Sequence, residues 1–411
     1  MDGPISPFAS QVAKNAPGPG TRFGGFAEYY FIGGNNDPTQ IPKDMLAKAA
    51  ETVIKRDGHM IAIYNMGVGP QGYPPLRAFV ADKMKRHRGI TADGENILIT
   101  TGSNQGIDLV VAAMINPGDV VVIEEHCYAS SITRFKKSGA VIIPVKLDDD
   151  GIVMDDLARI LAEQKAAGTP VKMIYTIPTI QNPTGSIMPM DRRVRMVELC
   201  RQFDTLIFED ECYADLIWAG GAPPALYALA PERTIHIGSF SKTLAPALRL
   251  GYATGDWEIL GRMTALKSDG GTGALDQMIA SEYFTTYFDQ HVASLTKVLN
   301  DKLDCMIEAV EAEFGTHMTL FRPKGGIFLW MKLPDEVDVR KLIAPAGKEG
   351  IVFNPGPEWS LLGDGAKSHL RLCFALNSKE NIREGVAKFA RVCFEQTGIP
   401  PQSRNVSNAA G

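Results

Sequence analysis

The sequence predicts an α/β protein made of a large domain, with a mainly parallel central sheet flanked by helices, and a smaller α+β domain. Between about residues 95 and 255, short apolar strands alternate with helical stretches, a pattern typical of a parallel sheet covered by helices on both faces. After about residue 285 this alternation gives way to one long helical stretch and further short strands. The chain has 411 residues, whereas a single hydrophobic core stops growing at about 250–300 residues. Two domains are therefore expected.

The expected elements of the large domain follow from apolar runs and from helix signals. Residues 103–115 are predicted to form a helix, because apolar residues recur there at helical spacing and Asn116-Pro117-Gly118 ends the pattern. Further helices are expected at 153–165 and 190–203. Strands are expected where a short, mostly apolar run stands between helical stretches, namely at 97–100, 120–123, 141–145, 173–177, 206–208 and 235–237.

The small domain is expected from the change of pattern near residue 285. A helix over about 287–314 leads to the apolar run 325–331, and a helix with short strands closes the chain. The tail is polar and contains Pro400-Pro401, which are features of a loosely held end. The expected divisions are an N-terminal arm that packs with the small domain (1–50), a large domain (51–290), a small domain (291–398) and a flexible tail (399–411).

Composition and charge exclude several classes of protein. The 42 basic and 47 acidic residues give a net charge of −5, whereas a nucleic-acid-binding protein needs a basic face. No apolar run approaches the ~18 residues that cross a bilayer, and the first residues lack the basic and apolar regions of a signal peptide. We therefore expect no nucleic-acid partner and no membrane span.

The six cysteines form no CxxC pair and no cluster with histidines. Such spacing is typical of free thiols in a reducing compartment and not of a disulfide framework or a zinc site. We expect a cytoplasmic protein without a bound metal.

The segment that follows the strand near 235–237 carries a candidate nucleophile. Lys242 stands just past this buried strand, between small hydroxyl residues, and Arg249 follows seven residues later. Partial burial and a nearby cation lower the pKa of a lysine and free its amine for Schiff-base chemistry. The hydroxyls and Arg249 are suited to grip a phosphate. Taken alone, the segment is equally compatible with an ordinary lysine in a serine-rich turn.

Two further segments end strands of the same predicted sheet. Asp210 ends the strand near 206–208, at the edge where parallel sheets bind ligands. A carboxylate there is able to keep a pyridine nitrogen protonated, and Tyr213 is close enough in sequence to bond the same ring. Asn182 lies in the Asn-Pro-Thr-Gly run 182–185, whose amide is also able to bind a ring oxygen. Taken alone, Asp210 also fits a helix cap, and residues 182–185 also fit a plain turn.

The combination of these motifs resembles the class I/II aminotransferases, which are pyridoxal 5′-phosphate (PLP) enzymes of fold type I, and within them the aminoadipate/kynurenine-type branch. The motifs appear in the order NPTG, DxxY and SxxK, with an arginine seven residues beyond the lysine. The resemblance extends from about Gly33 to residue 395. It also includes the segments Gly72-Tyr73-Pro74-Pro75-Leu76-Arg77, Thr101-Gly102-Ser103-Asn104-Gln105-Gly106, Arg322-Pro323-Lys324-Gly325-Gly326-Ile327-Phe328 and His369-Leu370-Arg371-Leu372.

The resemblance implies roles around the ring of PLP. Lys242 would bind the cofactor as a Schiff base and move the proton at the substrate Cα. Asp210 would pair with the pyridine nitrogen. Asn182 and Tyr213 would bond the ring's 3-oxygen, and Tyr128 would stack on the ring.

The resemblance also implies how the phosphate is held. Ser103 and Asn104 open the helix 103–115, and the N-terminus of a helix suits an anion. Ser239 and Arg249 would complete this phosphate site. Tyr73 would reach the phosphate of the neighbouring subunit, so that a homodimer with shared active sites is the expected assembly.

The substrate is expected to meet Arg371, Asn182 and Gly34. Arg371 would clamp the α-carboxylate through a bidentate pair. The glycine pair that includes Gly34 is followed here by Asn35-Asn36-Asp37, where the family usually has a more apolar stretch. We therefore expect a polar or cationic substrate side chain near Asp37. Lys267 is the only basic residue between 264 and 280, which disfavours a specialised aspartate aminotransferase.

The function implied by the resemblance is ping-pong exchange of an amino group between an L-amino acid and a 2-oxo acid such as 2-oxoglutarate or pyruvate. Relatives with the same motifs also act as lyases, decarboxylases or oxidases, and this alternative stays open. A second alternative is a non-catalytic PLP-binding regulator. It is disfavoured because only ~30 residues precede the first motif, which is too few for a DNA-binding domain.

Overall fold

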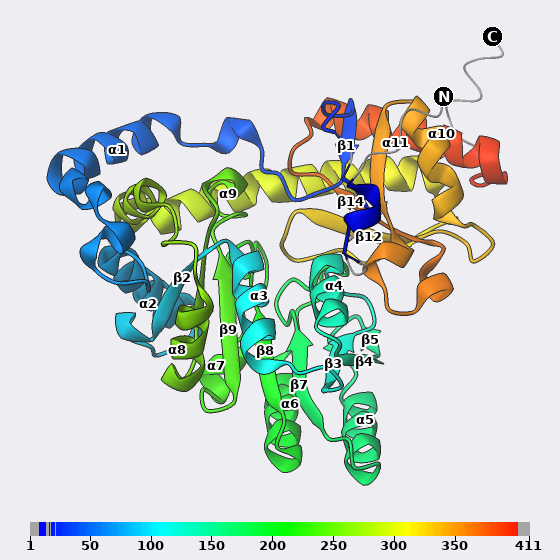
Figure 1. The fold of residues 1–411 in the computed structure, drawn as a ribbon. Coiled ribbons are helices and arrows are strands. Elements are labelled where there is room, and N and C mark those ends of the chain that lie inside the picture. The colour runs from blue at the N-terminus through cyan, green and yellow to red at the C-terminus, as the bar shows by residue number, and fades with distance from the viewer. Residues whose placement is uncertain (1–7, 14–15, 17, 21, 402–411) are drawn as a thin grey trace.

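The computed structural model describes residues 8–13, 16, 18–20 and 22–401, and its two main sheets lie side by side (Figure 1). The larger sheet has seven strands in the order β2-β10-β9-β8-β7-β3-β4. β10 is antiparallel to both neighbours, and the other pairs are parallel. The prediction of a mainly parallel sheet is confirmed. The strands are β2 (Ile97–Thr101), β3 (Val120–Glu124), β4 (Val141–Val145), β7 (Val171–Thr176), β8 (Leu206–Asp210), β9 (Thr234–Ser239) and β10 (Leu250–Thr254).

Helices cover both faces of this sheet, which explains why its strands are apolar at successive positions. In β8, Phe208 packs into the cluster that includes α3, α4 and α8, while Ile207 packs into the cluster with α5, α6 and α7. In Figure 1, α3 crosses in front of the strands. The helices are α3 (Ser103–Met114), α4 (Ala129–Lys137), α5 (Met154–Ala166), α6 (Met190–Phe203), α7 (Leu226–Leu229) and α8 (Trp257–Leu266).

A third core cluster joins the sheet to the helices at the beginning of the chain. Helices α1 (Lys43–Asp57) and α2 (Pro74–Arg88) pack against the first half of α9 (Ala274–Phe314). The prediction placed the start of α9 near residue 287, whereas the helix begins at Ala274. Its first turns bury Met278 and Phe284 against α1 and α2, contacts that stabilise a helix irrespective of local propensity.

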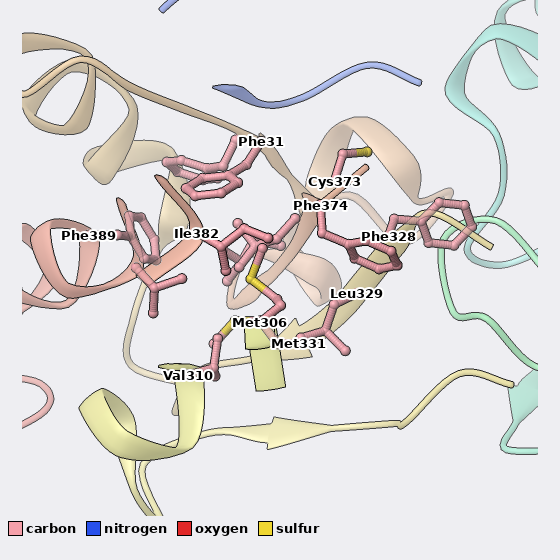
Figure 2. Close-up of a cluster of buried hydrophobic side chains, with 14 of the residues drawn as sticks. Phe31, Met306, Val310, Phe328, Leu329, Met331, Cys373, Phe374, Ile382 and Phe389 are labelled. Carbon is pink, nitrogen blue, oxygen red and sulfur yellow. The ribbon is translucent and has the colours of Figure 1, made fainter. Parts of the chain in front are cut away.

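The second sheet has five strands in the order β1-β13-β14-β12-β11. β1 pairs in parallel with β13, so that the N-terminal segment joins strands from the end of the chain. Figure 2 shows the core beneath this sheet, where Phe31, Met306 and Phe389 meet from β1, α9 and α11. The elements are β1 (Tyr29–Phe31), β11 (Thr319–Leu320), β12 (Phe328–Lys332), α10 (Ile343–Lys348), β13 (Ile351–Pro355), β14 (His369–Cys373) and α11 (Lys379–Thr397).

The 41-residue helix α9 belongs to both halves of the molecule. It runs from above the seven-stranded sheet to the five-stranded sheet (Figure 1). Its first half packs in the core with α1 and α2, and its second half packs under the five-stranded sheet. The two sheets are therefore held together by one continuous helix.

The remaining elements are short. A two-stranded hairpin consists of β5 (Leu147–Asp148) and β6 (Gly151–Ile152). Short 3-10 turns are η1 (Ala9–Gln11), η2 (Pro38–Gln40), η3 (Gly58–Ala62), η4 (Tyr64–Gly67), η5 (Gly94–Asn96), η6 (Pro246–Leu248), η7 (Val339–Leu342), η8 (Gly356–Trp359) and η9 (Gly363–Ala366). Of the helices in the described residues, none combines the length and apolar character needed to span a membrane. All six cysteines lie in the described part and are free thiols.

Candidate active site

A cavity of about 260 Å³ opens at the carboxyl ends of the parallel strands, beside the five-stranded sheet. Of the residues that the sequence singled out for the cofactor or substrate, all line it except Tyr73 and Asp37. The predicted residues that line it are Gly34, Ser103, Asn104, Tyr128, Asn182, Asp210, Tyr213, Ser239, Lys242, Arg249 and Arg371. The other lining residues are Gly33, Ile177, Cys212, Ser241, Pro246, Asn354 and Trp359.

Lys242 lies in the turn that follows β9, and its amine donates a 2.6 Å hydrogen bond to the carbonyl oxygen of Gly34. Burial lowers the pKa of this amine to about 8, and the nearby Arg371 and Arg249 act in the same direction. A side chain at position 34 would overlap the amine, so a larger residue there would displace the amine from this position. A large share of the amine is therefore neutral, and nucleophilic, at mildly alkaline pH.

Asp210 ends β8 at the floor of the cavity. Its Oδ2 accepts a 2.7 Å hydrogen bond from the hydroxyl of Tyr175, and its Oδ1 accepts one from the backbone N–H of Cys212. Burial raises the pKa of Asp210, while these two hydrogen bonds oppose the rise. The arrangement supplies a buried, oriented carboxylate that is suited to a cationic ring nitrogen.

Asn182 is held in place by its neighbour Gln181. The side-chain amide of Gln181 donates to Oε2 of Glu124 at 2.9 Å and to the carbonyl of His126 at 2.7 Å. Asn182 itself accepts a 2.8 Å hydrogen bond from Nη1 of Arg371. The Asn-Pro-Thr-Gly turn thus connects the end of β3 to the arginine on β14.

Aromatic side chains form two walls of the cavity. Tyr128 follows β3, and its ring lies 5.8 Å from that of Trp359. The buried Tyr213 packs edge-on against Phe328 at 5.2 Å, and burial raises the pKa of its hydroxyl well above the ordinary value. The hydroxyl of Tyr213 therefore remains protonated at neutral pH and is able to donate a hydrogen bond.

An anion site stands at the start of α3. The helix begins at Ser103 directly after Gly102, so its first backbone N–H groups point outward with the positive end of the helix dipole. Arg249 lies against Gly102, where any side chain would overlap the guanidinium. Its own partners are two carbonyls, those of Pro246 and Thr101. Within the described residues no carboxylate pairs with Arg249, so this donor set is suited to a phosphate from outside the chain.

Arg371 is a buried cation whose partners within the described chain are all neutral. Its guanidinium donates to the side-chain oxygens of Asn182 and Asn354 at 2.8 Å and to the carbonyl of Gly33 at 3.0 Å. The ring of Trp359 lies 3.8 Å from the guanidinium, and Nε of Arg371 is buried without a hydrogen-bond partner among the described residues. A buried charge is costly unless it is paired, so this site is suited to a carboxylate ligand.

Tyr73 does not line the cavity. It is 3% exposed, and its hydroxyl donates a 2.6 Å hydrogen bond to Asp57 of its own protomer. This bond occupies the hydroxyl within its own protomer, and the role of Tyr73 at the neighbouring subunit's phosphate stays a prediction. Tyr64 lies on the same connection between α1 and α2 and is 88% exposed. No pattern in the sequence marked it as a candidate site residue.

The predicted contact between Asp37 and the substrate side chain is wrong. Asp37 is 7% exposed and does not line the cavity. Its Oδ2 accepts a 2.7 Å hydrogen bond from the amine of Lys302 on α9, and its Oδ1 accepts one from the backbone of Thr39. The charge of Asp37 is therefore already neutralised within the chain.

Two lining residues, Trp359 and Asn354, were missed because only tertiary pairing brings them to the site. The backbone N–H of Cys127 donates to the carbonyl of Trp359, and that of Leu361 donates to the carbonyl of Glu125. These bonds join the segment that follows β3 to the segment that follows β13. His126 lies between these two bonds, and its Nδ1 is hydrogen-bonded to the hydroxyl of Ser360 at 3.0 Å. It does not line the cavity, so its contact is structural.

Glu209, Glu211 and His236 form a buried cluster whose possible ligand atoms lie close enough together to hold a metal ion. Their oxygens already have partners, however. Glu211 is paired with Arg88, and Glu209 accepts from His236 and from the backbone at the start of α7. The cluster therefore serves as an internal ion-pair network that fixes the strand on which Asp210 lies.

Comparison with known proteins agrees with this site. Residues 33–389 match the family described as aminotransferase class I and II. The chain is 31% identical to aromatic-amino-acid aminotransferase 1 of Thermococcus litoralis, over 89% of this chain and 87% of that protein. It is 32% identical to 2-aminoadipate transaminase of Thermus thermophilus, over 88% and 89% of the two chains.

Solved structures show the same likeness. LysN, the α-aminoadipate aminotransferase of Thermus thermophilus complexed with N-(5′-phosphopyridoxyl)-L-leucine, superposes with a TM-score of 0.81 at 32% identity, covering 88% of this chain and 91% of that one. Kynurenine aminotransferase of Pyrococcus horikoshii gives a TM-score of 0.84 at 31% identity, covering 89% and 91%. The anion site without a carboxylate of its own, the buried Asp210 and the low-pKa amine of Lys242 fit PLP. The chain belongs to the class I and II aminotransferases and is a PLP-dependent aminotransferase of fold type I.

Proposed function

We propose that this enzyme transfers the amino group of an aromatic L-amino acid to a 2-oxo acid, with Arg371 as the α-carboxylate clamp and Lys242 as the group that binds PLP and moves the proton. The observation that carries the proposal is the buried Arg371, which lines the same cavity as Lys242 and has only neutral partners in the described chain. A bidentate carboxylate would supply the missing charge.

Each chain residue has a definite task in this proposal. PLP, when bound, supplies an electron sink for the electron pair of the broken Cα–H bond. Asp210 would keep the pyridine nitrogen protonated, because a buried carboxylate beside it favours the cationic form. Asn182 and Tyr213 would bond the ring's 3-oxygen, and Tyr128 would lie on the ring face.

Lys242 would carry the proton between the substrate Cα and C4′ of the cofactor. Its pKa of about 8 is close to the pH at which a general base works best. Ser103, Asn104, Ser239 and Arg249 would hold the phosphate, since they surround the start of α3.

The substrate side chain is proposed to be aromatic. The cavity wall contains Tyr128, Tyr213 and Trp359, and one relative is an aromatic-amino-acid aminotransferase. Within the described lining, the cations are Lys242, Arg249 and Arg371, and all three have tasks at the cofactor or the α-carboxylate. No described lining cation therefore remains for a second carboxylate.

The enzyme is proposed to act as a homodimer in the cytoplasm. Six free thiols favour a reducing compartment. Exposed apolar side chains gather on α1, η3, η4 and the start of α9, which is typical of an interaction surface. This surface adjoins the anion site. Tyr64 lies beside the loop 270–273, and the hydroxyl of Thr272 in this loop is hydrogen-bonded to that of Thr101, two residues before Ser103. The residues are Ile54, Ile61, Ile63, Tyr64, Leu275 and Tyr287.

A mixed-dimer experiment tests this assembly and the contribution of Tyr64. Lys242→Ala and Tyr64→Ala chains are each expected to have low activity. If Tyr64 completes the partner's phosphate site, mixing them gives some dimers in which one of the two sites has both residues intact, and activity reappears. A monomer in light scattering, or no recovery on mixing, contradicts the proposal.

Steady-state kinetics with a panel of amino acids tests the reaction itself. With 2-oxoglutarate as acceptor, parallel double-reciprocal plots and an aromatic 2-oxo acid as product are expected. Release of ammonia or carbon dioxide, or consumption of oxygen, would instead identify a lyase, decarboxylase or oxidase on the same fold.

A further inference from the structure

The segment Gly33–Asp37 contacts both functional cations of the site. The carbonyl of Gly33 accepts from Arg371 at 3.0 Å, and the carbonyl of Gly34 accepts from the amine of Lys242 at 2.6 Å. The segment then crosses the turn that contains Lys242. The side chain of Asn36 faces the backbone of that turn.

Asn36 binds the lysine turn through a single amide group. Its Nδ2 donates to the carbonyl of Ser241 at 3.1 Å, that of Lys242 at 3.4 Å and that of Leu244 at 3.1 Å. Because carbonyls only accept hydrogen bonds, the nitrogen of the amide must face the turn. In the part of the chain that the structure describes, its Oδ1 is buried without a hydrogen-bond partner, so the side chain bears a cost that the three contacts offset.

The turn needs such support because its carbonyls are not paired in a regular helix or sheet. The carbonyl of Thr243 also accepts from a side chain outside the turn, namely Nε2 of His291 at 2.6 Å. The Nδ1 of His291 then accepts from the hydroxyl of Tyr283, which fits the neutral ring. Asn36 and His291 together bind the carbonyls of all four residues from 241 to 244.

Asp37 anchors Asn36 from the opposite side. Its carboxylate pairs with Lys302 at 2.7 Å, and the amine of Lys302 also donates to the carbonyl of Ala375 at 2.7 Å. This pair fixes the segment to α9 and to the loop after β14. Asn36 therefore reaches the lysine turn from a rigid base and not from a loose arm.

We propose that Asn36 is a positioning residue for Lys242: by binding the carbonyls of Ser241, Lys242 and Leu244 it fixes the turn so that the lysine amine stays in the cavity beside Gly34. The inference rests on the proposed function in one respect, the role of Lys242 as the group that binds PLP. Asn36 itself does not line the cavity, so it acts through the backbone of the turn.

Two variants and a matched control test this inference. Asn36→Ala and Asn36→Ser remove the amide donor, and Asn35→Ala removes an adjacent amide that neither lines the cavity nor makes a side-chain hydrogen bond within the described residues. The first readout is hydrogen exchange of the backbone amides of residues 240–245 in the PLP-free full-length protein. Loss of these contacts is expected to raise exchange about tenfold in both Asn36 variants, with exchange elsewhere and in Asn35→Ala unchanged.

The second readout is the rate at which the visible PLP band appears when PLP is added to the PLP-free protein. It is expected to fall about tenfold in both Asn36 variants, and kcat is expected to fall by a similar factor while KM changes less than about twofold. Asn36→Ser keeps a polar group and is the informative variant if Asn36→Ala does not fold.

The inference is overturned if both Asn36 variants behave like Asn35→Ala, or if exchange rises throughout the protein and not in the turn. A failure of the proposed function looks different, because the wild-type protein itself would then develop no visible band with PLP. The exchange comparison needs no cofactor and decides the role of Asn36 in either case.

Discussion

The hydroxyl of Tyr175 on β7 donates a 2.7 Å hydrogen bond to Oδ2 of Asp210 on the neighbouring strand β8. Both side chains are buried. Burial raises the pKa of Asp210, and the hydrogen bond from Tyr175 lowers it. Tyr175 therefore favours the ionised carboxylate that a pyridinium nitrogen requires, although it does not itself line the cavity.

The variant Tyr175→Phe removes this hydrogen bond and leaves the ring in place. The pKa of Asp210 is expected to rise further, so that the carboxylate holds the cofactor nitrogen less well. We expect kcat to fall about tenfold and the dissociation constant of PLP to rise. Tyr175→Phe with unchanged kcat and unchanged PLP affinity would show that the bond is irrelevant to catalysis.

Arg371→Gln tests the carboxylate clamp. Removing one partner of a buried, hydrogen-bonded charge pair costs about 2–5 kcal/mol, so kcat/KM for the amino acid is expected to fall at least 30-fold, about 2 kcal/mol. Titration of the apoprotein with PLP supplies the control, because Arg371 is not part of the phosphate site and PLP affinity should stay within about twofold. Equal losses in PLP binding and substrate binding would contradict the assignment.

Glu124→Gln tests the buried carboxyl that supports the Asn182 turn. Burial raises the pKa of Glu124 to about 7. A carboxyl with a raised pKa contributes stability that is present below about pH 4.5 and is lost as the pH rises through about 7. The free energy of unfolding of the wild type, relative to Glu124→Gln, should therefore fall between about pH 5 and pH 8. Urea unfolding over this range checks the slope, and a constant difference would refute the raised pKa.

Lys302→Met tests the anchor of the N-terminal segment. It leaves Asp37 buried without its cation, and breaking a buried pair in this way costs about 3–5 kcal/mol. Urea denaturation measures the loss. The double variant Asp37→Asn, Lys302→Met should recover much of it, because no unpaired charge then remains. A double variant as unstable as Lys302→Met would mean that packing, and not the unpaired charge, causes the loss.

The strands of the large sheet were predictable because helices cover both faces and make successive positions apolar. β10 was not, since its sequence Leu250-Gly251-Tyr252-Ala253-Thr254 contains small residues. Gly251 is needed there because any side chain would meet the backbone between Gly102 and Ser103, which is a constraint of tertiary packing. The start of α9 was missed for a similar reason, since its first turns are stabilised by α1 and α2.

The site residues that lie at strand ends were predictable, because parallel strands bring their carboxyl ends to one edge. Residues that depend on distant partners were not. Asp37 looked like a free carboxylate until Lys302 on α9 was seen to pair with it. Asn36 gave no local signal, since its three partners lie in a turn near residue 242.

The absorption spectrum of the purified protein, with PLP and then with an aromatic amino acid, tests most directly whether Lys242 carries the cofactor in an aminotransferase. The wild type is expected to show a visible yellow band that bleaches with the amino acid and returns on addition of 2-oxoglutarate. After borohydride reduction the cofactor should be found on Lys242, and Lys242→Ala should show neither the bound cofactor nor the cycle. A wild-type protein without this band, or a cofactor trapped on another lysine, would contradict the assignment.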